Sequence, residues 1–244
     1  MKRKDFIMRV GLAGAGFSIV PRHVLGGKGF TAPSDTLYIG AIGAGGRGND
    51  NLRQLALHPN VKVSHLCDVD ERMVSRAKEA YPNAPFYKDY RKMLETKRPD
   101  FVAVCPRHVD QRVSMIKAAC EFGAKAIYVE KPFARSLKEC DLISEACKRS
   151  GTLLAVAHRN RYHPALAVAK KLIKDGLLGQ VLAMRGRGKQ DHRGGGEDLW
   201  VLGTHVFDLF HAFAGKPVSC TATIKTKGKI ATQNQIYEGN EGLG

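Results

Sequence analysis

Residues 37–48 read LYIGAIGAGGRG, in which a short apolar run passes directly into the glycine pattern G-x-G-x-x-G. The run 37–42 predicts a buried strand, and Leu52 and Leu55 have the spacing of a helix that follows the glycines. A second apolar stretch at 61–66 predicts another strand, and Asp68 stands at its end. A strand, a glycine loop, a helix, a second strand and an acidic residue in this order are typical of a βαβ unit that binds a dinucleotide.

Each glycine of the loop meets a separate steric need. Gly43 permits the tight turn after the strand, Gly45 lets the backbone approach a pyrophosphate, and Gly48 lets the helix pack closely on the strand. The N-terminus of the helix adds unpaired N–H groups and the positive end of the helix dipole. We therefore predict a dinucleotide at this loop, and a glycine-rich turn without a ligand is the alternative.

The acidic residue bears on the choice of cofactor. Asp68 is expected to bind the ribose hydroxyls, and it favours NAD because a carboxylate repels the 2′-phosphate of NADP. Arg47 and Arg72 leave NADP open as an alternative.

Strand and helix patterns go on alternating as far as residue 157. Predicted strands cover 85–87, 101–105, 126–129 and 152–157, and predicted helices cover 71–80, 90–94, 109–122 and 137–149. Ser136 and Glu139 have the spacing of a capping box for the last of these helices. The alternation predicts an α/β fold with a doubly wound parallel sheet, a Rossmann domain, whose ligands bind beyond the carboxyl ends of the strands. Such ends carry the glycine loop, Asp68, Pro106, Lys131 and His158.

Several motifs together resemble the Gfo/Idh/MocA family of oxidoreductases. They span residues 37–215 and comprise the glycine loop, Asp68-Val69-Asp70, Cys105-Pro106, Glu130-Lys131-Pro132, the segment 158–164 and the segment 203–208. The resemblance implies NAD(P)-linked hydride transfer on a sugar, polyol or related carbinol. It also implies a cofactor site that consists of Gly43, Gly45, Gly46, Arg47, Gly48, Asp68, Cys105, Pro106, His108, Glu130, Lys131 and Pro132.

The resemblance assigns catalysis to Lys131 and His205. Lys131 matches the lysine of the family's Glu-Lys-Pro motif, which lies near the nicotinamide, and His205 matches the family's catalytic histidine. A partly desolvated lysine beside a nicotinium cation has a lowered pKa, and a histidine titrates near neutrality, so both suit proton exchange with an alcohol. The chain departs from the family at Val201, where Asp is usual, and at Asp110, where His is usual. A surface lysine and a helix-packing histidine are the structural alternatives.

Four further residues are predicted to contact the substrate, namely Arg161, His163, Trp200 and Asp208. Arg161 and His163 suit a structural linker between domains equally well, and Trp200 could simply pack. Asp208 could orient His205, bind substrate or face solvent.

The predicted organisation has three segments: a signal-like segment 1–36, the Rossmann domain 37–157, and the start of a second α/β domain at 158–244. The second domain is expected to contain helices at 165–174 and 205–214, strands at 181–187 and 218–226, and an open, mainly antiparallel sheet. Two strands make a marginal sheet, and the resemblance implies more of them, so we expect a C-terminally truncated chain. The full-length form is expected to be a homo-oligomer.

The first residues are organised like an export signal. Arg3-Lys4-Asp5-Phe6-Ile7 resembles a twin-arginine motif with a lysine in its second position, and a weakly apolar run follows at 10–20. We therefore expect export to the periplasm without a stable membrane anchor. A cytoplasmic enzyme with a frayed N-terminus is the alternative.

Composition excludes several classes of protein. The 244 residues carry a net charge of +16 and are 43% hydrophobic, which is globular, and no apolar stretch is long enough for a polytopic membrane protein. No zinc-finger spacing or RNP-like motif accompanies the charge, so no nucleic-acid partner is predicted. None of the six cysteines forms a C-x-x-C pair, so we predict core thiols and no metal site.

Two other functions remain as alternatives to the oxidoreductase. The first is an exported glycosidase that uses tightly bound NAD in a cycle of oxidation, elimination and reduction. The second is a non-catalytic NAD-binding protein, which Val201 and the short second domain would suit.

Overall fold

A computed structural model of the protein describes residues 31–188, 198–226 and 228–232. The signal-like segment up to residue 30, with its Arg3-Lys4 pair, lies outside the described residues. Within the part of the chain that is described, no helix combines the length and apolar character needed to cross a membrane.

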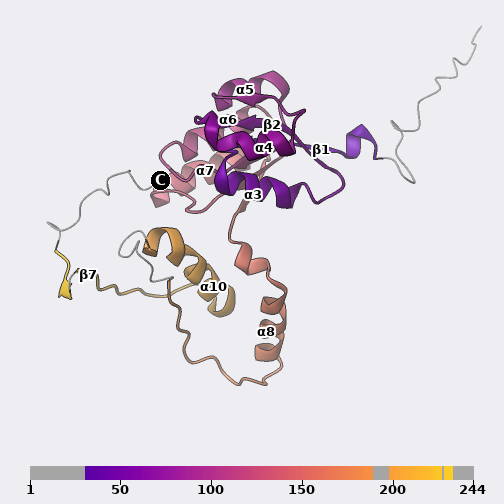
Figure 1. Ribbon diagram of the computed structural model, residues 1–244. Coiled ribbons are helices and arrows are strands. Elements are labelled where there is room, and N and C mark those ends of the chain that lie inside the picture. The colour runs from indigo at the N-terminus through magenta and orange to yellow at the C-terminus, as the bar shows by residue number, and fades with distance from the viewer. Residues whose placement is uncertain (1–30, 189–197, 227, 233–244) are drawn as a thin grey trace, which may run out of the picture.

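Six parallel strands form the sheet of the N-terminal lobe, in the order β3-β2-β1-β4-β5-β6. Figure 1 shows this lobe above the part of the chain that carries α8 (Pro164–Lys174) and α10 (Thr204–Ala214). This order confirms the predicted doubly wound Rossmann sheet. The strands are β1 (Leu37–Ile42), β2 (Val61–Cys67), β3 (Phe86–Tyr87), β4 (Phe101–Val104), β5 (Ala126–Val129) and β6 (Leu153–Val156).

Helices cover both faces of this sheet. The helices are α3 (Gly46–Leu55), α4 (Ser75–Ala80), α5 (Tyr90–Lys97), α6 (Arg112–Glu121) and α7 (Leu137–Ser150). Side chains alternate along a strand, so Val102 and Val104 of β4 pack in the cluster that includes α5, α6 and α7, while Ala103 packs in the cluster beneath α3 and α4. The predicted helix 71–80 is a 3₁₀ turn, Glu71–Val74, followed by α4, and the helix predicted from residue 109 begins at Arg112.

The topology brings the predicted site segments to one edge of the sheet. β1 lies between β2 and β4, and the order of the strands reverses there, which creates the crevice where ligands of such sheets bind. Gly43, Asp68, Pro106, Lys131 and His158 follow the carboxyl ends of β1, β2, β4, β5 and β6. The structure therefore confirms that these residues stand at strand ends.

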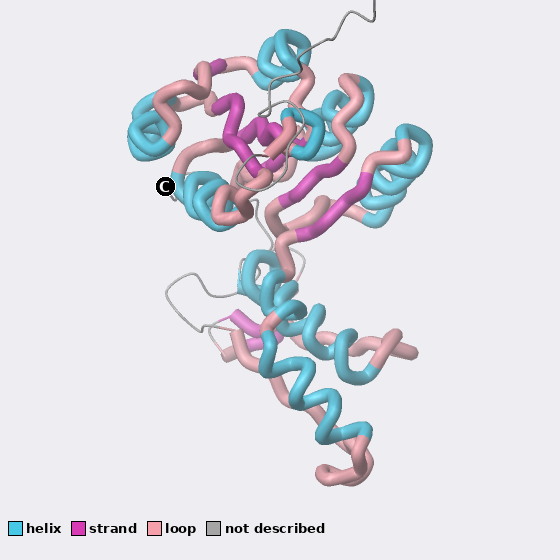
Figure 2. The backbone as a smooth tube through the Cα atoms, turned by 90° about the vertical axis from the view of Figure 1, so that its right-hand side faces the viewer, coloured by secondary structure: helices cyan, strands magenta, loops and turns pink. Residues whose placement is uncertain are grey.

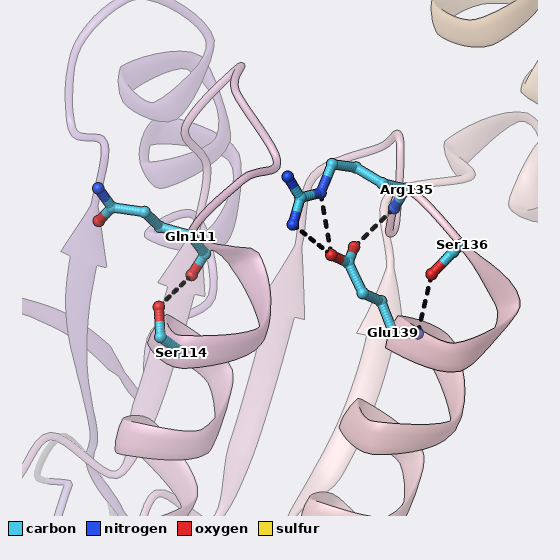
Figure 3. A network of polar contacts seen from close by, with 5 residues as sticks. All are labelled: Gln111, Ser114, Arg135, Ser136 and Glu139. Carbon is cyan, nitrogen blue, oxygen red and sulfur yellow. Dashed lines mark hydrogen bonds and ion pairs between the residues drawn. The ribbon is translucent and has the colours of Figure 1, made fainter.

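A polar side-chain cap begins α7 at this edge of the sheet (Figure 3). The Ser136 side chain accepts a hydrogen bond from Glu139 N at 3.2 Å and so caps α7 as predicted. The Glu139 carboxylate accepts from Arg135 N at 2.8 Å and pairs with the Arg135 guanidinium, so it does not complete the expected capping box with Ser136 N. At the start of α6, Ser114 Oγ donates to the carbonyl of Gln111 at 2.8 Å.

The second lobe is mainly helical where the structure describes it. It consists of a 3₁₀ turn (Arg159–Tyr162), α8 (Pro164–Lys174), a π-helical turn (Asp198–Gly203), α10 (Thr204–Ala214) and a two-stranded antiparallel pair, β7 (Lys225–Thr226) with β8 (Lys229–Ile230). The helices predicted at 165–174 and 205–214 are confirmed, and Figure 2 shows α8 and α10 standing apart from the large sheet.

The strand predictions for this lobe are wrong. Residues 181–188 form no strand, and within 218–226 only Lys225 and Thr226 do, so the predicted antiparallel sheet is reduced to the β7–β8 pair. A strand persists only where a neighbour accepts its hydrogen bonds, and 181–188 has none among the described residues. Gly186 instead lies against α10, where an added Cβ would come within 2.2 Å of Val206. Among the described residues after Ala157, only Gly203 is buried.

Candidate active site

The glycine loop is packed so tightly that side chains are excluded at three positions. Gly43 has φ +76°, and an added Cβ would lie 2.7 Å from Pro106 N. A Cβ on Gly45 would lie 2.9 Å from the Cβ of Met73, and one on Gly48 would lie 1.8 Å from the Gly43 carbonyl oxygen. The first turn of α3 therefore rests directly on the end of β1, and the loop is pinned between β4 and the turn after β2.

The N-terminus of α3 is open by contrast. A Cβ on Gly46 would meet no heavy atom within 4 Å, and Gly45, the N-cap, has no side chain to satisfy the first N–H groups of the helix. Unpaired N–H groups at the positive end of a ten-residue helix are suited to an anion such as a pyrophosphate. The Arg47 side chain beside them is exposed and paired with Asp50.

Asp68 ties the glycine loop to the end of β2. Its carboxylate accepts hydrogen bonds from Gly45 N at 3.1 Å and from Asp70 N at 3.2 Å. Arg72, one of the two arginines that left NADP open, is engaged by Asp70, because its guanidinium makes two bonds of 3.0 and 2.8 Å to that carboxylate. These bonds lower the pKa of Asp70 to about 2.

A buried polar network lies beneath the ends of β4 and β5. The Glu130 carboxylate accepts from Asn51 Nδ2 at 2.9 Å and from Lys131 N at 3.1 Å, which joins α3 to the Glu-Lys-Pro loop. Arg112 is fully buried and donates to the main-chain carbonyls of Pro106, at 2.8 Å, and of Glu130. The two strand-end loops that flank the crevice are thus joined by one guanidinium.

Sequence reasoning missed Asn51 and Arg112. A signal for Arg112 was available, because it lies on the same helical face as Ile116 and Cys120, and a charged residue on an apolar face is buried only where it has polar partners. Asn51 carried no such signal, since its partner Glu130 is distant in the sequence.

Two other predicted cofactor residues differ in their surroundings. Cys105 is buried, and this burial raises the pKa of its thiol to about 12, while Asn51 Nδ2 lies 3.6 Å from its sulfur. His108 is exposed on the loop before α6.

Lys131 connects the two lobes. It is partly buried and follows β5, and its Nζ donates a hydrogen bond of 3.0 Å to the main-chain carbonyl of Val201. This carbonyl belongs to the π-helical turn that leads into α10, so the ammonium lies against the segment that carries His205. At position 201 the backbone oxygen, and not a side-chain carboxylate, holds the lysine.

His205 lies in the first turn of α10 and packs against His158, which follows β6. The ring centroids are 5.6 Å apart, and the rings meet edge to face at 84°. Neither Nδ1 atom has a hydrogen-bond partner among the described residues, although both atoms are buried. Burial lowers the pKa of both imidazoles, and for His205 the nearby charge of Lys131 lowers it further.

Arg161 and Asp208 form an ion pair beside these rings. Arg161 Nε donates to Asp208 Oδ1 at 2.9 Å, which raises the pKa of the guanidinium, while Asp208 Oδ2 is buried without a partner in the described structure. The other two predicted substrate residues are placed differently. His163 caps α8 by accepting from Ala165 N at 3.2 Å, and Trp200 is 40% exposed on the π-helical turn.

Comparisons with known proteins agree with this arrangement. A family model described as an oxidoreductase family with an NAD-binding Rossmann fold matches residues 37–158. The inositol 2-dehydrogenase/D-chiro-inositol 3-dehydrogenase of Lactiplantibacillus plantarum is 30% identical over 156 residues, which are 63% of this chain and 44% of that enzyme. The D-apiose dehydrogenase of Paraburkholderia graminis is 29% identical over 138 residues, which are 57% of this chain and 36% of that enzyme.

Solved structures show the same fold. The myo-inositol 2-dehydrogenase of Lactobacillus plantarum superposes with a TM-score of 0.65 and 23% sequence identity, over 74% of this chain and 57% of that one. The chain spans less than half the length of the curated relatives that it matches.

Proposed function

Because the chain belongs to the Gfo/Idh/MocA family of oxidoreductases, we propose that it binds NAD at the glycine loop and oxidises a carbinol of a sugar or polyol. The observation that carries this proposal is the bond from Lys131 Nζ to the Val201 carbonyl, at 3.0 Å. It brings a lysine at the carboxyl edge of the sheet to the segment that bears His205. In the proposed site, the nucleotide loop and these two proton-carrying groups would serve one substrate at the carboxyl edge of the sheet.

The residues around the crevice fit a dinucleotide. The uncapped start of α3 would take the pyrophosphate, and Asp68 would accept hydrogen bonds from the ribose hydroxyls. NAD suits the site better than NADP, because Arg72 is held by Asp70 and Asp68 would repel a 2′-phosphate. When bound, NAD supplies a hydride acceptor at its nicotinamide ring.

The chain itself supplies the proton transfer. A carbinol that loses hydride must also lose its hydroxyl proton, and a group within hydrogen-bond reach must take it. His205 is suited to this task because burial and the charge of Lys131 lower its pKa, which favours the neutral imidazole that can take a proton. Lys131 Nζ, which donates to the neutral Val201 carbonyl, would donate to the same hydroxyl oxygen and orient it.

A neutral polyhydroxylated substrate suits the rest of the site. The Asp208 Oδ2 atom is buried without a partner in the described structure and would accept a bond from a substrate hydroxyl. Relatives named as dehydrogenases of inositols and of D-apiose support the same class of substrate. Arg161, His163 and Trp200 remain predicted contacts at its edge.

The test begins with NAD binding by the purified chain, followed by NADH formation with a panel of inositols, pentoses and hexoses. Lys131→Met is expected to keep NAD binding within a few-fold and to lower kcat by about 10²–10⁴-fold. The matched control is Lys148→Met, which removes an exposed lysine on α7. An equal loss of rate in both variants, or turnover that survives without Lys131, would contradict the assignment.

The same experiment separates the other two functions. A product with a cleaved glycosidic bond and no net NADH would favour the NAD-dependent glycosidase. Tight NAD binding with no turnover on any compound of the panel would favour the non-catalytic protein.

A further inference from the structure

The contact between His158 and His205 brings together two titratable rings from distant segments. One ring follows β6 and the other begins α10, and they meet edge to face with centroids 5.6 Å apart. A functional imidazole is usually oriented by a hydrogen bond at one of its nitrogens. Here both Nδ1 atoms are buried and unpartnered within the described structure. Without such a bond at Nδ1, the edge-to-face contact with His158 is the interaction in a position to orient the His205 ring.

The groups around the pair determine how many protons it holds. Cations outnumber anions among the charged groups that act on the two rings, which are Lys131 and Glu130 after β5, Arg159 and Arg161 in the 3₁₀ turn, and Asp208 in α10. The Asp208 carboxylate is itself engaged by Arg161. Two imidazolium ions at 5.6 Å would repel each other enough, at an effective dielectric constant of about 20, to separate their titrations by about two pH units.

We propose that His158 and His205 act as one unit that accepts a single proton and no second one, in which His158 is the positioning residue and His205 exchanges the proton with the substrate. The proposal rests on the proposed function and adds a second histidine to it. Neutral His205 takes the hydroxyl proton as the carbinol loses hydride. The imidazolium formed lies within cation–π reach of the neutral His158 ring, and its charge keeps a second proton off His158 until the first has left.

The lowered pKa of each ring supports this scheme. For His158 the main cause is burial, opposed by Asp208, and for His205 it is burial together with the charge of Lys131. The lowering favours the neutral form of both rings, which suits His205 to accept a proton.

A titration that needs no substrate tests the pair directly. The ring carbon Cε1–H signals of the histidines are followed by NMR between pH 4 and 8 in the whole chain, in His158→Phe and in His205→Phe. Phenylalanine keeps an aromatic ring but cannot bind a proton. We expect the wild-type pair to titrate in two steps about two pH units apart. In each variant the remaining histidine ring should titrate in a single step, near the higher of the two wild-type pH values. Because the charge on His205 holds His158 at the lower step in the wild type, a His158 titration that His205→Phe leaves unchanged would overturn the proposal.

Turnover tests the positioning role. His158→Ala removes the ring and is expected to lower kcat by at least about tenfold with little change in KM, whereas His158→Phe should restore most of that loss. The acid limb of the pH–rate profile should follow the titration of His205 in each variant, because neutral His205 takes the hydroxyl proton. The control is His211→Ala, an exposed histidine at the other end of α10, which should alter neither the rate nor the profile.

The two readouts keep this inference separate from the proposed function. Coupled titration without turnover on any substrate would retain the histidine unit and reject the oxidoreductase. Turnover with uncoupled titration, or with equal losses in the Ala and Phe variants, would retain the oxidoreductase and reject the unit.

Discussion

Replacing Gly48 with alanine should separate helix α3 from the end of β1. The added Cβ would lie 1.8 Å from the Gly43 carbonyl oxygen, although such contacts are essentially never shorter than 3.0 Å. Gly43 has little freedom to retreat, because its N–H donates to Cys67 O at 2.8 Å and the space beside its own Cα is filled by Pro106. The start of α3 must therefore move by more than about 1 Å, since proteins resist such overlap by shifting backbone.

Two opposing contributions determine how much the Gly48→Ala substitution changes the free energy of unfolding. Alanine is favoured over glycine inside a helix by about 1 kcal/mol, and overpacking costs about 1–3 kcal/mol. The difference between the two is a fall of up to about 2 kcal/mol in the free energy of unfolding. The dissociation constant for NAD should rise about 10- to 100-fold, because the N–H groups that meet the pyrophosphate move away by about 1 Å.

The assay is urea denaturation together with calorimetric titration of NAD. Gly151→Ala is the matched control, because Gly151 ends α7 with φ +71° and an added Cβ meets nothing within 4 Å. Its left-handed backbone should cost about 1–2 kcal/mol of stability and leave NAD binding unchanged. The reasoning is refuted if Gly48→Ala binds NAD as tightly as the wild type.

Three further predictions concern other parts of the lobes. Arg112→Met leaves two buried main-chain carbonyls without a donor, which costs about 1–3 kcal/mol for each carbonyl. Removal of the buried charge offsets part of this cost, so urea denaturation should show a net loss of about 2 kcal/mol in the free energy of unfolding. A variant as stable as the wild type would show that the cost of burying the guanidinium charge outweighs its hydrogen bonds. Asp68→Ser removes the carboxylate that disfavours a 2′-phosphate, so the ratio of the NADP to the NAD dissociation constant should fall at least about tenfold; an unchanged ratio would place cofactor choice elsewhere. Because the pKa values of His158 and His205 are lowered by folding, the unfolded chain binds more protons below about pH 6.5, so the free energy of unfolding should decrease as the pH falls from 7 to 5. The decrease should be smaller in the double variant with phenylalanine at both positions, and an equal decrease would assign the effect to other groups.

Local patterns were sufficient for the Rossmann lobe. The apolar run 37–42, the glycine loop and the alternation of strands and helices to residue 157 predicted the six strands and their parallel arrangement. They succeeded because a buried parallel strand must be apolar along its length, and because a crossover helix must show one apolar face. The predicted ends of the parallel strands then placed four residues at the carboxyl edge of the sheet, although the sequence contains no distances between them. These residues are Asp68, Pro106, Lys131 and His158.

The second lobe shows the limit of such patterns. The apolar character of 181–187 indicated a strand, but a strand exists only if another strand pairs with it, and no residue in the segment records that partner. The helices at 165–174 and 205–214 were predictable, because a helix makes its hydrogen bonds within its own segment.

The sequence by itself determined the doubly wound sheet, the conformation of the glycine loop and the edge at which the candidate site lies. Only the tertiary structure decided what meets at that edge: the clamp of Arg112 on two carbonyls, the bond from Lys131 to Val201, and the contact of His158 with His205. The physical reason is the range of the interactions. Hydrophobic periodicity and glycine sterics act over a few neighbouring residues, whereas these contacts join segments whose closeness is a product of the folded sheet.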